Sequence, residues 1–366
     1  MAQARRTPGL ESIDVKAALV LAAGFGTRLR PYTEYMPKPL LPVAGIEPLF
    51  FALWRAQCLG VKKFYVNAHY HHGQINMFLK NVAEPVLGIS VEMLHENPIL
   101  GTGGAIRNLL QKTEAGDFDE LVVINGDTLL GLGELEQLDS PQASWCLVTP
   151  DQNFLAKYKP LWVNAEGGYA GVGEITHPEA GWEPTHFFGM HALKADALAH
   201  LREDSSPVTE SDLFRGIYRP LLDAGFEIQA IRHSLSSEEF WYDMTNKDFL
   251  LEAQGELLGT IAGDTSCWKA ALEARWGQEP KLMGKSWLLG VDPGCVNWSK
   301  SRGSIVVSPQ TLKCEGKVDL DASVLILEGQ DRSLGRRLVR NSLLMSASPK
   351  SAIAADSNLE NEIIFL

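Results

Sequence analysis

Positive charge, paired cysteines and long apolar runs are all scarce in this chain. Its 33 Lys and Arg residues stand against 45 Asp and Glu residues, which gives a formal net charge of −12. A domain that binds nucleic acid usually presents a basic face, so this balance argues against nucleic acid as a partner. The five cysteines have no spacing typical of a zinc site or a disulfide framework, and a reducing cytoplasm is the expected setting.

Signals for membrane insertion are also missing from the sequence. No uncharged apolar run approaches the roughly 20 residues that cross a bilayer as a helix. Residues 1–14 contain two arginines but no apolar segment after them, unlike a secretory signal peptide, so we expect no membrane partner. With 366 residues, 45% of them hydrophobic, the chain is long enough for one large α/β domain and a smaller second one.

The most informative stretch is a loop at residues 21–45, with the sequence LAAGFGTRLRPYTEYMPKPLLPVAG. It follows an apolar run, residues 15–21, that predicts a buried parallel strand. Gly24 and Gly26 lack side chains where a backbone could close on a ligand, and Thr27 adds a hydroxyl beside the backbone N–H groups. A phosphate group fits such a concave loop.

The same loop is basic within an acidic protein. Arg28, Arg30 and Lys38 lie against a single acid, Glu34, which indicates an anionic ligand. Four prolines restrict the backbone and so lower the entropy lost when these side chains are held in place. From glycines and charges alone, an ordinary loop with solubilising arginines is an equal alternative.

The order of the residues favours a ligand site, because LAAGxGTRL followed by PKPLxPVxG resembles the signature of the sugar-1-phosphate nucleotidylyltransferases. The resemblance implies that Arg28 holds a leaving pyrophosphate and that Lys38 bridges the reacting phosphates. It also implies nucleotide contacts along the loop, at Leu21, Ala22, Ala23, Gly24, Gly26 and Thr27. The partners would be a nucleoside triphosphate, GTP or UTP, and a sugar 1-phosphate.

A second glycine-rich segment, GTGGAI at residues 101–106, follows a predicted strand at residues 89–94. It matches neither the dinucleotide fingerprint G-x-G-x-x-G nor a P-loop. A flat base could approach a helix start edged by glycines, and Glu96 or Asn97 could hydrogen-bond the base edge. The resemblance implies nucleotide contacts at Glu96 and Gly103, with a plain helix cap as the alternative.

Two acids are candidates for a metal site. Asp127 directly follows a predicted strand, residues 120–125, so we expect it at the same sheet edge as Gly24, where open α/β folds bind ligands. A carboxylate beside triphosphate oxygens suits Mg²⁺, although such an Asp is often only a turn cap. The resemblance implies Mg²⁺ ligands at Asp127 and at Asp243, which could equally cap a helix that begins near Thr245.

Residues 143–240 read as short strands rich in aromatic residues, which by themselves belong more often to a core than to a pocket. The resemblance implies that this part builds the sugar pocket, with sugar contacts at Asn125 and Gly189. Its likeness is to the branch that includes mannose- and heptose-1-phosphate guanylyltransferases and N-acetylmuramate-1-phosphate uridylyltransferases.

One feature departs from the commoner family pattern. Where many members carry Glu-Lys-Pro, with the lysine on the sugar phosphate, this chain reads Trp182-Glu183-Pro184. Another cation must balance that phosphate, and Lys157, Lys159 and Arg28 all remain candidates.

Beyond residue 258, apolar residues recur at spacings that weakly resemble a left-handed parallel β-helix, with an irregular packing domain as an equal alternative. We predict a Rossmann-like nucleotidylyltransferase domain with a mixed, mostly parallel sheet at residues 12–258. A small β-rich domain at residues 259–345 and a loose tail at residues 346–366 would follow, and a homo-oligomer could form through the β-rich domain.

The predicted reaction is the formation of a nucleoside-diphosphate sugar and pyrophosphate, most like that of a mannose-1-phosphate guanylyltransferase, with N-acetylmuramate- or heptose-1-phosphate as the alternative substrate. Two other classes compete. A non-catalytic regulatory subunit that binds nucleotide sugar should have lost Arg28, Lys38 or one of the acids, and none is lost. A nicotinamide-dependent oxidoreductase is disfavoured by the missing dinucleotide fingerprint.

Overall fold

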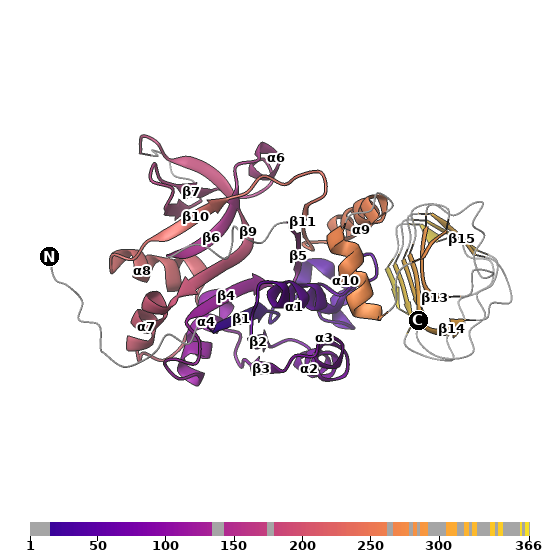
Figure 1. The fold of residues 1–366 in the computed structure, drawn as a ribbon, viewed down its shortest axis with the longest axis horizontal. Helices are drawn as coiled ribbons and strands as arrows, with labels where there is room; N and C mark the ends of the chain where they lie inside the picture. Colours follow the sequence, from indigo (N-terminus) through magenta and orange to yellow (C-terminus); the bar gives the residue numbers. More distant parts are fainter. Residues whose placement is uncertain are drawn as a thin grey trace.

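The computed structural model describes residues 15–133, 143–173, 179–261 and 266–277, together with strands between residues 281 and 365. Its centre is a mixed sheet of nine strands in the order β10-β6-β9-β4-β1-β2-β3, in which β7 also pairs with β9 and β8 pairs with β7 (Figure 1). The strands are β1 (Lys16–Leu21), β2 (Lys63–Ala68), β3 (Val91–His95), β4 (Glu120–Asn125), β6 (Ser144–Thr149), β7 (Leu161–Val163), β8 (Tyr169–Val172), β9 (Glu183–Lys194) and β10 (Ile228–Arg232).

Strand β1 lies at the middle of the parallel part of this sheet. It pairs in parallel with β2 on one side and with β4 on the other, and β2 continues in parallel to β3. The register places Leu21, the last residue of β1, opposite both Asn67 and Asn125. The loops that follow these three strands therefore leave the sheet at one edge, as the sequence predicted.

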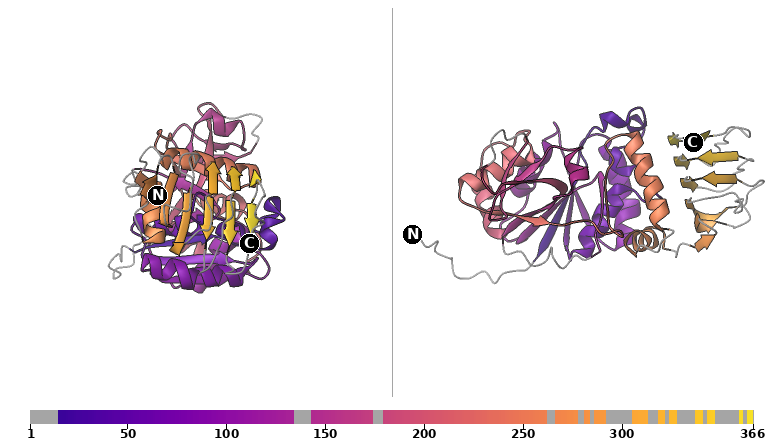
Figure 2. Two further views of the ribbon diagram at one scale, coloured as in Figure 1. Left: turned by 90° about the vertical axis from the view of Figure 1, so that its right-hand side faces the viewer. Right: turned by 90° about the horizontal axis from the view of Figure 1, so that it is seen from above.

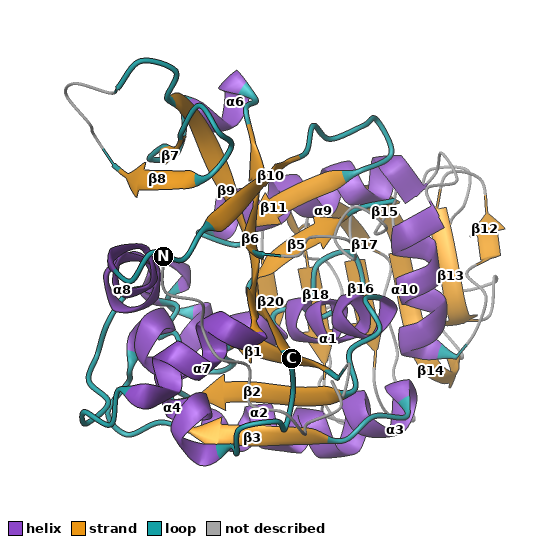
Figure 3. Ribbon diagram, turned by 60° about the vertical axis from the view of Figure 1, so that its left-hand side comes forward, coloured by secondary structure: helices purple, strands orange, loops and turns teal. Residues whose placement is uncertain are grey.

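Helices cover both faces of the sheet (Figure 3). Alternate residues of β1 point to opposite faces of the sheet. Ala18 and Val20 belong to the buried cluster on one face, and Ala17 and Leu19 belong to the cluster on the other. The first layer contains α1 (Pro48–Cys58), α2 (His72–Phe78), α3 (Glu84–Leu87), α9 (Lys247–Ile261) and α10 (Ser266–Trp276), with a π-helical turn η4 (Leu79–Ala83). The second layer contains α4 (Gly101–Lys112), α7 (Ala195–Glu203) and α8 (Arg219–Asp223), with a π-helical turn η5 (Phe214–Tyr218).

Shorter elements surround the edge where the loops leave the sheet. An antiparallel ribbon of two strands, β5 (Thr128–Gly131) and β11 (Phe240–Asp243), lies beside α1 and α9. The others are the 3₁₀ helices η1 (Thr27–Leu29), η2 (Tyr32–Glu34) and η3 (Lys38–Leu40), and the short helix α6 (Gln152–Leu155).

The predicted boundary at residue 258 is wrong, because α9 runs through it. Helix α10 also belongs to the first unit: Trp268 is fully buried in its core, and Arg275 forms a bidentate ion pair with Glu47, with both N···O distances at 2.8 Å. Figure 2 shows α10 between the central sheet and the C-terminal strands.

From β14 onward the C-terminal strands alternate between two sheets along the chain. One sheet has the order β12-β13-β14-β16-β18-β20, parallel from β13 onward, and the other is the parallel sheet β15-β17-β19. The bounds are β12 (Lys281–Met283), β13 (Ser286–Val291), β14 (Ile305–Leu312), β15 (Val318–Asp321), β16 (Val324–Leu327), β17 (Arg337–Arg340), β18 (Leu343–Ser346), β19 (Leu359–Glu360) and β20 (Ile363–Phe365). Residues 346–366, predicted as a loose tail, thus contain two paired strands, so that prediction is corrected.

The mixed α/β class with a mostly parallel central sheet is confirmed by this topology. In the part of the chain that the structure describes, no helix is both long and apolar enough to cross a bilayer.

Two histidines of β9 are buried in the core. Burial lowers the pKa of His186 to about 4 and that of His191 to about 3, because the charged imidazolium would lose its hydration. His191 is 2% exposed and packs against Tyr218 and Phe187, while His186 lies among Phe154, Tyr158 and Trp241. Both rings are therefore neutral in the folded protein at pH 7.

We expect the free energy of unfolding to fall as the pH is lowered below about 6.5, the pKa of an unfolded histidine. Below this pH the histidines become protonated in the unfolded chain but stay neutral in the folded one. Each histidine therefore lowers the free energy of unfolding by up to about 1.4 kcal/mol per pH unit until its folded pKa is reached. His191→Phe should reduce this pH dependence between pH 6.5 and 5, as measured by urea unfolding. The exposed His72 provides a control, since His72→Phe should leave the slope as it is; an unaltered slope in His191→Phe would contradict the assignment.

Candidate active site

Lys38 connects the loop after β1 to both predicted metal ligands. Its Cβ lies only 3.2 Å from the position that a Cβ on Gly26 would occupy. Its Nζ donates a hydrogen bond to Asp127 Oδ2 at 2.6 Å and lies 3.6 Å from Asp243 Oδ1. The Lys38 side chain is 10% exposed and the two carboxylates are 34% and 25% exposed, so this charge cluster is partly withdrawn from water.

The backbone fixes the two acids at this place. Gly126 donates its N–H to the Leu21 carbonyl at 2.9 Å, and a Cβ on Gly126 would lie 2.7 Å from that same oxygen, so only glycine lets the chain pass so close to β1. In the β5–β11 ribbon Thr128 is opposite Asp243, and Met244 donates its N–H to the Asp127 carbonyl at 3.2 Å. The ribbon thus brings together two acids that are far apart in the sequence.

Asp243 is the last residue of β11, and α9 begins only at Lys247. The alternative that Asp243 caps a helix starting near Thr245 is therefore wrong. Its carboxylate instead accepts a hydrogen bond from the Thr245 hydroxyl and faces the Lys38 ammonium.

The donor set at this point fits Mg²⁺. Mg²⁺ prefers carboxylate oxygens and is commonly held by one or two of them together with substrate phosphates. Among the described residues no group of three or more His, Cys, Asp and Glu is arranged to hold a metal by itself. Two carboxylates beside the basic, glycine-rich loop at residues 21–45 are compatible with this mode of binding.

The tip of the loop is open and its base is packed. Gly24, Thr27 and Arg28 are exposed, and within the described residues no atom comes within 4 Å of a Cβ built on Gly24. Gly26 has a φ of +62°, and a Cβ there would lie 2.8 Å from Thr33 Cγ2, so both its conformation and its surroundings require glycine. Phosphate oxygens can approach the tip, while Leu21, Ala22 and Ala23 form its less exposed base.

A chain of hydrogen bonds supports Ala22, in the buried part of this loop, from inside the protein. Ala22 donates its N–H to Asn67 Oδ1 at 2.8 Å, and Asn67 Nδ2 donates to Glu96 Oε1 at 2.9 Å. Glu96 Oε2 accepts the Leu100 N–H at 3.0 Å, and the residue is 1% exposed. The Ala22 N–H therefore has its hydrogen-bond partner inside the protein. A nucleobase could hydrogen-bond Glu96 only by displacing one of these donors.

Gly103 packs against the protein's own chain, and its contact with a nucleotide stays a prediction. The residue is buried, its N–H bonds to the Ser211 carbonyl at 2.9 Å, and a Cβ on it would lie 2.4 Å from the Asp212 carbonyl oxygen. The close approach that glycine allows is used by the protein's own segment 209–212, which packs against the start of α4.

Asn125 and Gly189, both predicted to contact the sugar, lie together. Gly189 has a φ of +79° in an irregular stretch of β9, and a Cβ on it would lie 2.7 Å from Asn125 Nδ2. Asn125 ends β4 two residues before Asp127. The Asn125 side chain packs against Gly189, where only a glycine leaves room for it.

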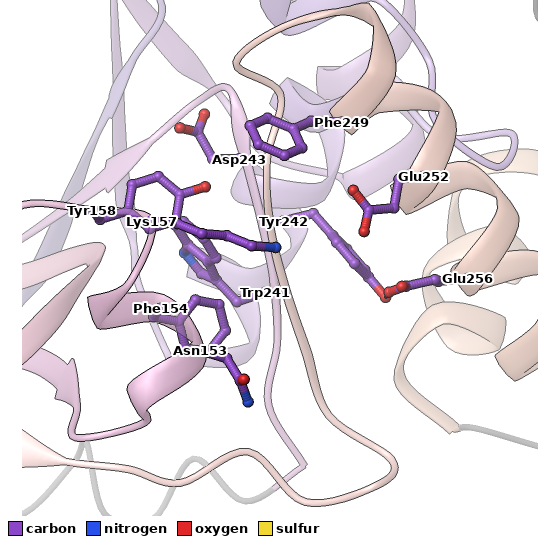
Figure 4. A pocket seen from close by; sticks show the side chains of 10 residues that line it. All are labelled: Asn153, Phe154, Lys157, Tyr158, Trp241, Tyr242, Asp243, Phe249, Glu252 and Glu256. Carbon is purple, nitrogen blue, oxygen red and sulfur yellow. The ribbon is translucent and has the colours of Figure 1, made fainter.

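A cavity of about 350 Å³ opens beside Asp243 (Figure 4). Its lining comes from the region of α6, from β11 and from α9: Asn153, Phe154, Lys157, Tyr158, Trp241, Tyr242, Asp243, Phe249, Glu252 and Glu256. Burial, and then the Asp243 and Glu252 carboxylates, raise the pKa of Tyr158 to about 12, with Arg28 acting in the opposite direction. Tyr158 therefore keeps its hydroxyl proton and can donate it to a ligand oxygen.

The sequence did not single out Asn67, Glu252 or Glu256 as site residues. For Asn67 a signal was present, because it ends a strand at the same sheet edge as Asp127. The two glutamates are exposed on α9, and only the tertiary structure shows that they line a cavity together with residues of α6 and β11.

Comparison with known proteins gives one family match, since residues 17–143 fit the family model described as nucleotidyl transferase. A D-glycero-alpha-D-manno-heptose 1-phosphate guanylyltransferase from Aneurinibacillus thermoaerophilus is 34% identical over 112 residues, 31% of this chain and 46% of that protein. A mannose-1-phosphate guanylyltransferase from Mycobacterium tuberculosis is 35% identical over 132 residues, 36% of this chain and 35% of that protein. The chain therefore covers less than half the length of either relative.

Among solved structures, the inositol-1-phosphate CTP transferase from T. maritima superposes with a TM-score of 0.55 at 16% identity, over 70% of this chain and all of that chain. At this identity the likeness concerns the fold, and it agrees with the mixed sheet described above. The motif, the family model and the named relatives agree: residues 17–143 of this chain match the nucleotidyl transferase family.

Proposed function

We propose that this protein is an enzyme that forms a nucleoside-diphosphate sugar and pyrophosphate from a nucleoside triphosphate and a sugar 1-phosphate. The observation that carries the proposal is Lys38: its ammonium lies within 3.6 Å of both Asp127 and Asp243, and its Cβ packs against the loop at Gly26. A guanylyltransferase acting on a mannose- or heptose-type sugar is favoured, since the relatives carry those names.

The reaction is a displacement at phosphorus. An oxygen of the sugar 1-phosphate attacks the α-phosphorus of the triphosphate, a new P–O bond forms, and the bond to the bridging oxygen of the leaving pyrophosphate breaks. Such phosphoryl transfers need mainly positioning and neutralisation of charge. Arg28, at the exposed tip of the loop, would hold the pyrophosphate, and Lys38 would meet the reacting phosphates.

Asp127 and Asp243 would hold Mg²⁺. When bound there, the cation would neutralise the phosphate charge and orient the triphosphate. The local electrostatics agree, because one lysine between two carboxylates leaves the cluster with a net negative charge that a divalent cation can balance.

We infer that the cavity beside Asp243 takes the sugar. Asn125 would contact the sugar from the inner side, with Gly189 making room for it. Of the three candidate cations for the sugar phosphate, Lys157 is the one that lines this cavity, with its Nζ 5.9 Å from the centre of the Phe249 ring. We therefore assign to Lys157 the role of the missing Glu-Lys-Pro lysine.

We interpret the C-terminal strands as a parallel β-helix, because β14 to β20 alternate between two parallel sheets. A β-helix offers flat faces through which a homo-oligomer could form. Cys58, Cys146 and Cys267 are free thiols, which supports a cytoplasmic setting.

Asp127→Asn should lower the turnover number by about 10²–10³, because a charged ligand and the partner of Lys38 are lost together. Pyrophosphate release measures the rate, and a thermal melt followed by circular dichroism reports the fold. Asp117→Asn is a matched control, because Asp117 also pairs with a lysine, Lys63, at 2.8 Å, but away from the site. Wild-type turnover in Asp127→Asn would contradict the assignment of Asp127 as a ligand of Mg²⁺.

A substrate panel tests the function itself. Pyrophosphate release should be detected for at least one pairing when four nucleoside triphosphates are each combined with mannose, heptose, glucose and N-acetylmuramate 1-phosphates. GTP with a neutral sugar is the expected pairing. Binding of nucleotide sugar without any pyrophosphate release would favour a regulatory subunit instead.

Asn67→Leu should destabilise the protein by about 2–5 kcal/mol and weaken nucleotide binding, because it leaves the Ala22 N–H and Glu96 Oε1 without their shared partner in a buried place. Urea unfolding measures the first effect and calorimetric titration with a triphosphate the second. Gln74→Leu removes a comparable but exposed amide hydrogen bond and should cost no more than about 0.5 kcal/mol. Equal losses in the two variants would contradict a special role for Asn67.

A further inference from the structure

The charges around the cavity beside Asp243 are distributed unevenly. Three carboxylates line it, those of Asp243, Glu252 and Glu256, against one basic side chain, Lys157. In Figure 4 Asp243 lies at one end of the cavity, while both glutamates project from α9 at the other. A ligand whose phosphate lies toward Asp243 would therefore extend its far end toward two acids.

The two glutamates differ in how they are held. Glu256 accepts a hydrogen bond from the Tyr242 hydroxyl at 2.7 Å, and burial together with this contact raises the pKa of Tyr242, so the tyrosine remains a donor. Glu252 lies one helical turn earlier on the same face of α9, and none of the described residues donates a hydrogen bond to it. Its carboxylate is thus available to accept from a ligand.

The remaining lining is aromatic. Phe154, Trp241 and Phe249 provide ring surfaces that suit the C–H faces of a sugar ring, and a volume of about 350 Å³ is at the small end for ligand pockets. Hydroxyl groups of a monosaccharide would donate to Glu252, whereas a carboxylate on the sugar would face like charges and could donate nothing.

We propose that this cavity selects sugar 1-phosphates whose sugar part is uncharged, and that Glu252 is the residue that rejects acidic sugars. The proposal rests on the proposed function and narrows it, since it favours a neutral hexose or heptose over a sugar with a carboxylate, such as N-acetylmuramate. The sugar phosphate neutralises Lys157. The charge around the rest of the sugar therefore comes from Glu252 and Glu256.

The test compares sugar phosphates that differ only at C6: mannose with mannuronic acid 1-phosphate, and glucose with glucuronic acid 1-phosphate. In each pair that supports turnover, the wild-type enzyme should prefer the neutral sugar by about tenfold or more in kcat/KM. Glu252→Gln should reduce this preference by about three- to tenfold, and Glu252→Lys should reduce it further. Higher salt should also weaken the preference, because Glu252 is exposed.

Glu227→Gln is the matched control, since it removes one negative charge from an exposed position just before β10 and should leave the preference unchanged. Thermal melts of all variants check that they are folded. Equal use of neutral and acidic sugars by the wild-type enzyme, or an unchanged preference in both Glu252 variants, would overturn this inference while leaving the proposed function intact. If no sugar phosphate of either kind is turned over with any triphosphate, the proposed function fails and this inference fails with it.

Discussion

The contact between the Lys38 ammonium and the carboxylates of Asp127 and Asp243 is the interaction on which the site depends. A single nitrogen lies 2.6 Å from one acid and 3.6 Å from the other, so the loop at residues 21–45 and two distant acids belong to one charge cluster. Partly withdrawn from water, such a cluster is screened less than surface charges are, and it is organised before any substrate arrives. A triphosphate that enters meets cationic and anionic groups already at fixed positions.

The scaffold around this contact explains why it can form. Parallel pairing of β1 with β2 and β4 brings three loops to one edge, where the Asn67 side chain supports one loop and Asp127 begins the next. The antiparallel β5–β11 ribbon then supplies Asp243 from the far end of the unit. Glycines at positions 26, 126 and 189 are required where backbone or side chains come within about 3 Å, so small residues are placed at the tightest contacts.

The sequence predicted the parts of the site that lie in local motifs. The loop at residues 21–45, the position of Asp127 and the mixed sheet could be predicted, because strand-then-loop patterns are local and their sheet edge follows from parallel pairing. The meeting of Asp127 with Asp243 came from family resemblance, since no local pattern links residues so far apart. The packing of Gly103 could not be predicted, because a glycine that faces a ligand and one that faces the segment 209–212 look alike in a sequence. The tail was misjudged because its strands are short and their partners lie in other turns of the chain.

The most direct test of the account is a crystal structure with Mn²⁺, a non-hydrolysable nucleoside triphosphate and a neutral sugar 1-phosphate, with the metal located by anomalous scattering. The account predicts an anomalous peak at about 2.2 Å from carboxylate oxygens of both Asp127 and Asp243. It also predicts the triphosphate along the loop at Gly24–Arg28 and the sugar beside Trp241. A metal bound away from these two acids, or a triphosphate bound away from that loop, would contradict it.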